Sequence, residues 1–126
     1  MPVNIMIIHA SDFIRINVDG ALDRFASGQA LVDIAWMIKT PGENHVLIDT
    51  RDARVKLSPD DLFELAVAFT RFPSLAASKI ALLTAMDGAH AAQFLELVGQ
   101  SRGAHLKAFT SMEEAIAWLR TKEQQE

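Results

Sequence analysis

The chain lacks cysteine entirely, carries no strong excess of either charge and has no long apolar run. Without cysteine there is no disulfide framework, no cysteine-ligated metal site and no thiol nucleophile. A formal net charge of −4 argues against a nucleic-acid binder that relies on a broad basic face. No apolar run approaches the ~20 residues of a membrane-spanning helix. Because no basic segment opens the sequence, we also expect no signal peptide and a cytoplasmic location.

What the chain has is a hydrophobic content of 50% in 126 residues. That composition is too apolar for a disordered chain, and the length matches one domain with its own core. Charged residues are spread evenly, with no linker, repeat or low-complexity segment. We therefore expect a single domain over residues 1–120 and a polar tail over residues 121–126.

The first forty residues combine strand and helix patterns. Residues 3–9 and 13–18 are rich in isoleucine and valine and predict two strands, joined as an antiparallel hairpin, with Asp19-Gly20 ending the second. Apolar residues at helical spacing then predict a helix over about 21–39. Ser27 is an alternative N-cap for a shorter helix, because Gly28 inside the longer one is unfavourable.

The rest of the chain alternates short apolar runs with amphipathic segments. Residues 45–49, 79–83 and 105–109 predict buried strands, and helices are expected after Ser58, after Asp87-Gly88 and after Ser111. Strands separated by helices run parallel, because a helical crossover returns the chain in the same direction. The sequence therefore predicts an α/β fold in the order β-β-α-β-α-β-α-β-α, with a five-stranded mixed sheet and covering helices.

In such a sheet, ligands and partners usually meet the carboxyl ends of the parallel strands. The segment after the strand at 45–49 is expected to be a polar loop that is locally basic. It carries Asp49, Arg51, Asp52, Arg54 and Lys56. The functional interpretation is a contact with an anion or an acidic partner, next to the helix that starts at Ser58. The alternative is a solvated loop whose opposite charges pair with each other.

Two further features have both a structural and a functional interpretation. Ser58 is expected to cap its helix, and phosphorylation there would instead add negative charge at the favourable end of the helix dipole. Large apolar side chains beyond the helix stripes either complete the core, or form an exposed patch for a partner. A third interpretation is an apolar pocket for an acyl chain, lined by Phe63, Phe69, Met86 and Phe94.

Signatures of catalysis are missing from the sequence. There is no nucleophile elbow, phosphate-binding loop or dinucleotide fingerprint. The four histidines have no metal-ligand spacing. We therefore expect no enzymatic activity, no catalytic residues, no metal and no cofactor.

Several stretches resemble the STAS superfamily, in particular its SpoIIAA-like branch. The matching stretches are residues 14–22, 46–49, the helix after Ser58, and residues 109–119. The resemblance implies a partner-binding domain, because sporulation members of the branch antagonise an anti-sigma kinase and are phosphorylated on a serine at the start of their second helix. Ser58 falls at that position. The phosphorylated members carry Asp-Ser-Ser/Thr-Gly there, whereas this chain has Leu57-Ser58-Pro59-Asp60, which weakens the expectation of phosphorylation.

The leading hypothesis is a non-enzymatic interaction or regulatory domain that binds a protein partner and is switched at the start of the second helix, with a homodimer also considered. The alternative is a carrier of a small apolar ligand or lipid, because the SpoIIAA-like branch has a distant similarity to the lipid-carrying SEC14 domains. A lesser alternative is a degenerate response-regulator receiver, in which Asp49, Thr84 and Lys107 resemble the phosphoacceptor, switch and conserved lysine positions. Against a receiver, the first strand lacks the following acidic pair that holds Mg²⁺.

Overall fold

The structure is a computed structural model that describes residues 3–10, 12–38 and 45–121. Strands β1 (Asn4–His9) and β2 (Ile14–Leu22) form the antiparallel hairpin that the sequence predicts. Ile7 lies opposite Ile16 in the register of this hairpin. Ile16 is fully buried, and Ile7 packs against the same core from the edge of the sheet. The hairpin therefore contributes one apolar face to the interior.

Three parallel strands extend the sheet from β2. They are β3 (His45–Val55), β4 (Lys79–Leu83) and β5 (His105–Phe109), and the strands lie side by side in the order β1-β2-β3-β4-β5. All five residues of β4 are buried, which explains the apolar run Ile80–Leu83 that follows Lys79. The predicted five-stranded mixed sheet is confirmed, and β4 and β5 have the predicted bounds.

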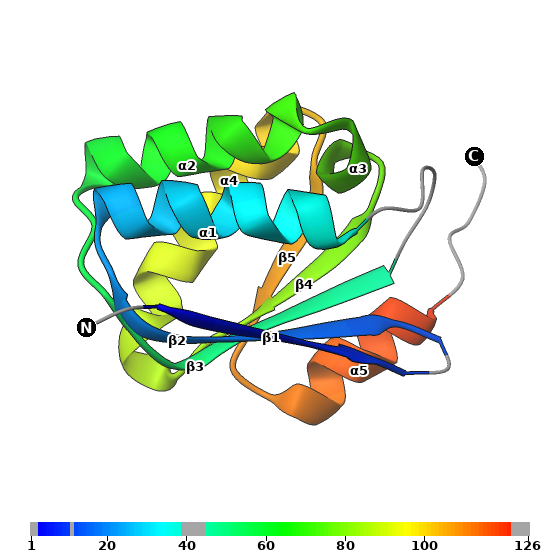
Figure 1. Ribbon diagram of the computed structural model, residues 1–126. Helices are drawn as coiled ribbons and strands as arrows, with labels where there is room; N and C mark the ends of the chain where they lie inside the picture. Colours follow the sequence, from blue (N-terminus) through cyan, green and yellow to red (C-terminus); the bar gives the residue numbers. More distant parts are fainter. Residues whose placement is uncertain (1–2, 11, 39–44, 122–126) are drawn as a thin grey trace.

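Helices cover the two faces of the sheet unequally (Figure 1). One face carries α1 (Arg24–Met37), α2 (Pro59–Arg71), the short α3 (Pro73–Ala76) and α4 (Ala89–Ser101), which follows a 3₁₀ turn, η1 (Met86–Gly88). The opposite face carries only α5 (Met112–Arg120). The larger core lies under the first group, and a smaller core joins Leu47 and Leu83 to Leu119 of α5.

Lys79 fixes the end of α5 to the sheet. Its side chain is buried, and Nζ donates hydrogen bonds to the carbonyl oxygens of Trp118 at 2.6 Å and Thr121 at 2.8 Å. Nζ also lies 4.7 Å from the centre of the Trp118 ring. A cation at a helix C-terminus satisfies unpaired carbonyl groups and interacts favourably with the helix dipole. This arrangement explains why a lysine can be buried at the first position of β4, an interior strand of the sheet.

The polar segments expected to end two strands instead lengthen them. Asp19-Gly20 does not terminate β2, and the expected loop over residues 50–54 belongs to β3. Asn17 pairs with Asp49 and Asp19 with Asp52, so β3 carries one extra residue at this point. Beyond it Gly20, at φ +109°, pairs with Ala53. Backbone pairing between β2 and β3 therefore continues where the side chains are already polar, which hydrophobic periodicity does not reveal.

The first helix begins at neither of the two expected places. Asp23 is its N-cap, and the Asp23 carboxylate accepts a hydrogen bond from the Ala26 amide at 2.8 Å. The alternative cap, Ser27, lies one turn inside α1 and is buried. The expected C-terminal residues 39–42 lie outside the described residues, as does most of the expected tail over residues 121–126.

Candidate functional site

The polar residues expected at the sheet edge centre on Asp49 of β3. Its side chain lies on the α5 side of the sheet, between two arginines that come from neighbouring strands. Arg51 Nη2 lies 2.8 Å from Asp49 Oδ2 and Arg51 Nε lies 3.0 Å from Oδ1, so the guanidinium grips the carboxylate with two hydrogen bonds. Arg15 of β2 donates from Nη2 to Oδ2 at 3.2 Å. The Arg51 amide adds a fourth hydrogen bond to Oδ1, at 3.0 Å.

These contacts determine the charge state of Asp49. Burial alone would raise the pKa of its carboxyl group, but the hydrogen bonds from Arg51 and the positive charges of Arg51 and Arg15 outweigh that effect. The pKa of Asp49 therefore lies below its ordinary value. The same pairing raises the pKa of Arg51. Asp49 is therefore ionised, and both of its carboxylate oxygens accept hydrogen bonds from Arg15 or Arg51.

The remaining charged residues of this segment point to solvent. Asp52, Arg54 and Lys56 are exposed, whereas Asp49 is only 7% exposed. Because the positive charge of Arg51 is paired with Asp49, the exposed positive charges of this segment that a partner could contact are those of Arg54 and Lys56. The structure thus divides the predicted site into a paired cluster on one side and two exposed cations next to the start of α2.

Ser58 caps α2 as predicted. Its hydroxyl accepts a hydrogen bond from the Asp61 amide at 3.1 Å, and the Asp61 carboxylate accepts one from the Ser58 amide at 3.2 Å. This reciprocal arrangement is a capping box, with Pro59 as the first helical residue and acidic residues in the first turn. Ser58 is nevertheless exposed at the surface. Its hydroxyl is therefore both a structural cap and accessible to another protein.

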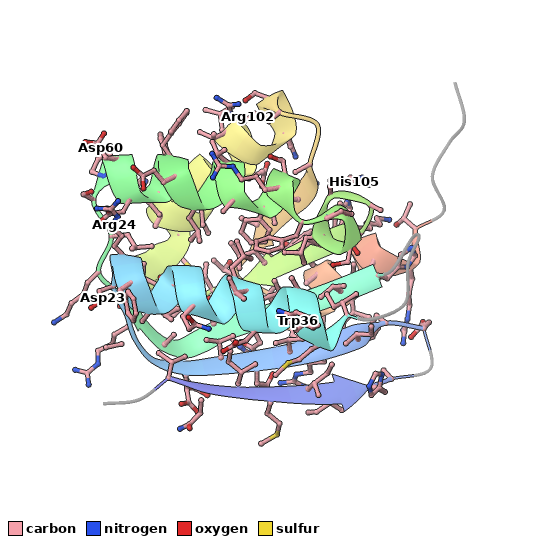
Figure 2. The ribbon with its side chains drawn as sticks, turned by 45° about the horizontal axis from the view of Figure 1, so that its top comes forward. Asp23, Arg24, Trp36, Asp60, Arg102 and His105 are labelled. Carbon is pink, nitrogen blue, oxygen red and sulfur yellow. The ribbon has the colours of Figure 1, made fainter. Side chains whose placement is uncertain are left out.

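A groove of about 1080 Å³ lies between α1 and α2, and Lys56 and Asp61 are among the residues that line it. Figure 2 shows Asp23 and Arg24 at the start of α1, at the same end of the molecule as Asp60 at the start of α2. Arg24 bridges the two helices through a contact with Glu64 at 3.2 Å and a longer one with Asp61 at 3.9 Å. Two aromatic residues of the groove are exposed, Phe25 by 83% and Phe63 by 42%. The surface around the start of α2 thus combines charges with apolar groups.

An apolar cavity of about 80 Å³ lies between the sheet and the helices of the larger layer. Of the four residues expected to line a pocket, Phe69 lines this cavity. Phe63 is instead at the surface, stacked against the Arg102 guanidinium at 5.2 Å, and Met86 is 77% exposed. Phe94 is partly buried and packs against the core. The cavity therefore lies deeper than the expected pocket, beneath α1 as well as α2.

Two residues of these sites were not singled out from the sequence. Arg15 contacts Asp49 across 34 positions of the chain, and only the pairing of β2 with β3 brings them together. Ser27 lines the cavity, although its position suggested a helix cap. The alternation of Arg15 and Asn17 with Ile14, Ile16 and Val18 was a usable signal for Arg15, since it marks the second face of β2. Among the residues that the structure describes, no cluster of three histidine or acidic side chains forms a metal site.

Comparison with solved structures identifies the fold. An anti-sigma factor antagonist from Mycobacterium paratuberculosis matches with a TM-score of 0.60 at 13% identity, covering 94% of this chain and 95% of that one. SpoIIAA, an anti-sigma factor antagonist solved in its unphosphorylated form, matches with a TM-score of 0.56 at 17% identity, covering 93% and 96%. An uncharacterised protein from Shewanella loihica with a SpoIIAA-like fold gives 0.57 at 17% identity, covering 94% of each chain. No protein-family model matches the sequence, and no curated protein matches it significantly.

The chain therefore has a SpoIIAA-like fold, as its sequence predicts. The receiver alternative does not agree with this topology. A receiver has the doubly wound strand order 2-1-3-4-5, whereas this sheet is ordered 1-2-3-4-5 and its first strand is antiparallel. Within the described residues, no helix has the length and apolar character needed to cross a membrane.

Proposed function

We propose that this protein is a non-enzymatic regulatory domain that acts by binding another protein. The observation that carries the proposal is the similarity of fold, over 94% of the chain, to an anti-sigma factor antagonist. By analogy with that protein, the partner proposed here is a regulator of the anti-sigma factor type. Fold alone does not determine function, so the proposal also depends on a surface suited to a protein contact.

The proposed contact is the α2-start surface, which we define as Arg54, Lys56, Ser58 and Phe63. All four residues are exposed. They lie at the carboxyl end of β3 and on the first turns of α2, and two of them, Lys56 and Phe63, line the groove between α1 and α2. Two cations beside an aromatic side chain favour a partner that presents acidic groups around an apolar one. Asp49 supports this surface from within the sheet, because its ion pair with Arg15 of β2 holds β3 against β2.

Ser58 is the proposed switch on this surface. A phosphate there would add nearly two negative charges beside Arg54, Lys56 and the two carboxylates of the first turn. An acidic partner attracted by the two cations would then be repelled. The capping hydrogen bond is compatible with this role, since an acidic group at the same position also accepts from the helix amides.

The contact can be tested by site-specific photo-crosslinking in cells. A photoreactive phenylalanine analogue replaces Phe63, and a control protein carries it at Met6, which is 60% exposed on strand β1. We expect one dominant adduct from position 63 and none from position 6. The same adducts from both positions, or none from position 63, would contradict the proposed surface.

The captured protein is then purified and titrated calorimetrically with charge variants. Lys56→Glu is expected to weaken binding about tenfold or more, because it reverses an exposed charge within the contact. The matched control is Lys107→Glu, on strand β5 at the far edge of the sheet. Ser58→Asp is expected to act like Lys56→Glu, whereas Ser58→Ala retains binding. Equal affinities for Lys56→Glu and Lys107→Glu would rule out this surface.

A further inference from the structure

The cavity beneath α1 is lined almost entirely by apolar groups, and Ser27, Thr50 and Thr84 contribute its few polar side chains. Its walls come from all parts of the larger layer, including Val18 and Leu82 from the sheet, Ile34 from α1 and Leu95 from α4. Cavities lined in this way stay dry, and an engineered one of about 150 Å³ binds benzene. A volume of about 80 Å³ is roughly half as large, so it suits a molecule smaller than benzene.

One polar atom in this cavity has no partner. Ser27 is only 6% exposed, and its Oγ makes no hydrogen bond to any residue that the structure describes. The Ser27 amide is satisfied by the Asp23 carbonyl at 2.9 Å, so the helix itself does not need the hydroxyl. A buried hydroxyl without a partner is unfavourable, and such groups are uncommon in folded proteins. An oxygen atom of a bound molecule would supply the missing acceptor.

The cavity has an outlet at the carboxyl edge of the parallel strands. Its lining includes Val55, which is 37% exposed at the end of β3, and the half-buried Leu57 and Gly88. Figure 1 shows the ends of β2 and β3 at the side of the sheet where α1 and α2 begin. Ligands of α/β proteins characteristically enter from this edge. The cavity therefore lies nearest to solvent at this edge, where its lining residues are partly exposed.

We propose that this cavity is a binding site for a small apolar molecule that carries one hydrogen-bond-accepting oxygen. Apolar walls hold the hydrocarbon part, and the Ser27 hydroxyl donates a hydrogen bond to the oxygen. The site differs from the pocket expected from the sequence, since Ser27 and α1 contribute to it and Phe63 and Met86 do not. It is also separate from the α2-start surface, so either can exist without the other.

Tetrahydrofuran and cyclopentane are matched probes, because they are five-membered rings that differ by one oxygen. Each is titrated into the full-length protein while backbone amide chemical shifts are followed. We expect saturable shifts at cavity residues with both compounds. Ser27→Ala should weaken tetrahydrofuran binding about three- to tenfold, the effect of one lost hydrogen bond, and leave cyclopentane binding unchanged.

Variants that fill the cavity complete the test. Ala30→Leu from α1 and Ala91→Leu from α4 each place a larger side chain in the lining and should abolish binding of both compounds. If Ala30→Leu does not fold, the measurement is made on Ala91→Leu instead. Gln29→Ala, on the exposed face of α1, is the control and should bind like wild type. Unsaturable shifts in the wild type, undiminished binding in a folded filled variant, or equal effects of Ser27→Ala on both probes would overturn the proposal.

Discussion

Asp49 holds together two arginines that belong to different strands. A buried carboxylate is stable only when its charge is compensated, and here the guanidinium groups of Arg15 and Arg51 provide the compensation. Both arginines keep part of their surface in water, with 33% and 41% of their side chains exposed, so their own desolvation is limited. The cluster thus secures the pairing of β2 with β3 at the point where their apolar sequence ends.

Replacing Asp49 by asparagine should lower the free energy of unfolding by about 2 kcal/mol at pH 7, the scale of charged hydrogen bonds. Because the folded pKa of Asp49 lies below that of the unfolded chain, its stabilisation is fully present above the unfolded value of about 3.9. It is lost as the pH falls through the folded value. The difference between wild type and Asp49→Asn should therefore shrink on acidification, as measured by urea denaturation between pH 7 and pH 3.

Asp52→Asn is the matched control, because Asp52 lies on the same strand and is exposed. Its effect should stay within about 0.5 kcal/mol at every pH. A difference between wild type and Asp49→Asn that is the same at pH 3 as at pH 7 would show that the charge of Asp49 is not what stabilises the cluster.

Ser58→Ala should cost about 1 kcal/mol of stability, because the Asp61 amide loses its acceptor. Ser58→Asp should stay within about 0.5 kcal/mol of wild type, since aspartate caps a helix as well as serine does. Ser101→Ala is the control, because the exposed Ser101 hydroxyl donates to a carbonyl at the end of α4 and caps no amide. Chemical denaturation distinguishes the three. If Ser58→Ala and Ser101→Ala have equal stability, the cap contributes nothing.

Elements were predictable where side-chain pattern and backbone pairing coincide. In β4 and β5 the apolar run has the same length as the strand, and Ser58 with Pro59 marks the start of α2 directly. The extensions of β2 and β3 escaped prediction, because polar residues such as Asp19 and Asp52 interrupt the apolar pattern while the backbone continues to pair. The short α3 was not predicted either, since four residues are too few to display a helical period.

The candidate site was predictable to a similar extent. Arg54, Lys56 and Ser58 were expected to be accessible and are exposed. The pairing of Arg51 with Asp49 was considered, but the contribution of Arg15 depends on strand register and could not be deduced from spacing. The cavity was misplaced for a related reason. Residue type alone does not show whether an apolar residue such as Phe63 lies on the exposed side of its helix or on the side that faces the core.

Gly28 and Gly103 differ in backbone conformation, so replacing each by alanine should have opposite effects on stability. Neither Gly28, inside α1, nor Gly103, after α4, has any atom within 4 Å of the position that a Cβ would take. Gly28→Ala should therefore stabilise the protein by about 0.5–1 kcal/mol, because alanine favours a helix. Gly103 has φ +91°, so Gly103→Ala should destabilise it by about 1 kcal/mol or more.

Thermal or urea denaturation of both alanine variants measures this contrast, and each serves as the other's control. Because the space available to the methyl group is equal, backbone conformation is the only difference. Changes of the same sign in both variants would contradict the assigned backbone at one of the two glycines.

At the scale of the whole molecule, the two layers of helices are unequal and so is the protection of the strands. β4 lies between two strands and beneath helices on both faces, and every residue in it is buried. β1 is at the edge, paired only with β2 in the described part of the chain. Its side chains Met6 and Ile8 are 60% and 41% exposed. Solvent therefore reaches the hairpin half of the sheet more readily than it reaches β4.

Hydrogen exchange should reproduce this gradient. Amides of β4 are expected to exchange only through global unfolding, with an opening free energy equal to the free energy of unfolding. Amides of β1 should exchange through local opening at much lower free energy. Native-state exchange followed by NMR or mass spectrometry over a denaturant series measures both. Equal protection of β1 and β4 would indicate that the edge is covered in solution, for example by a second copy of the chain.

The order of the strands in the sheet repeats their order in the sequence. Each new strand therefore pairs with the one made just before it, and no strand has to be inserted between two that are already paired. Loop-closure entropy stays small under this arrangement, which favours a fast folding rate for a sheet protein. During synthesis the sheet can grow from its amino-terminal hairpin one crossover at a time. The protein needs its last helix, α5, only to close the second face.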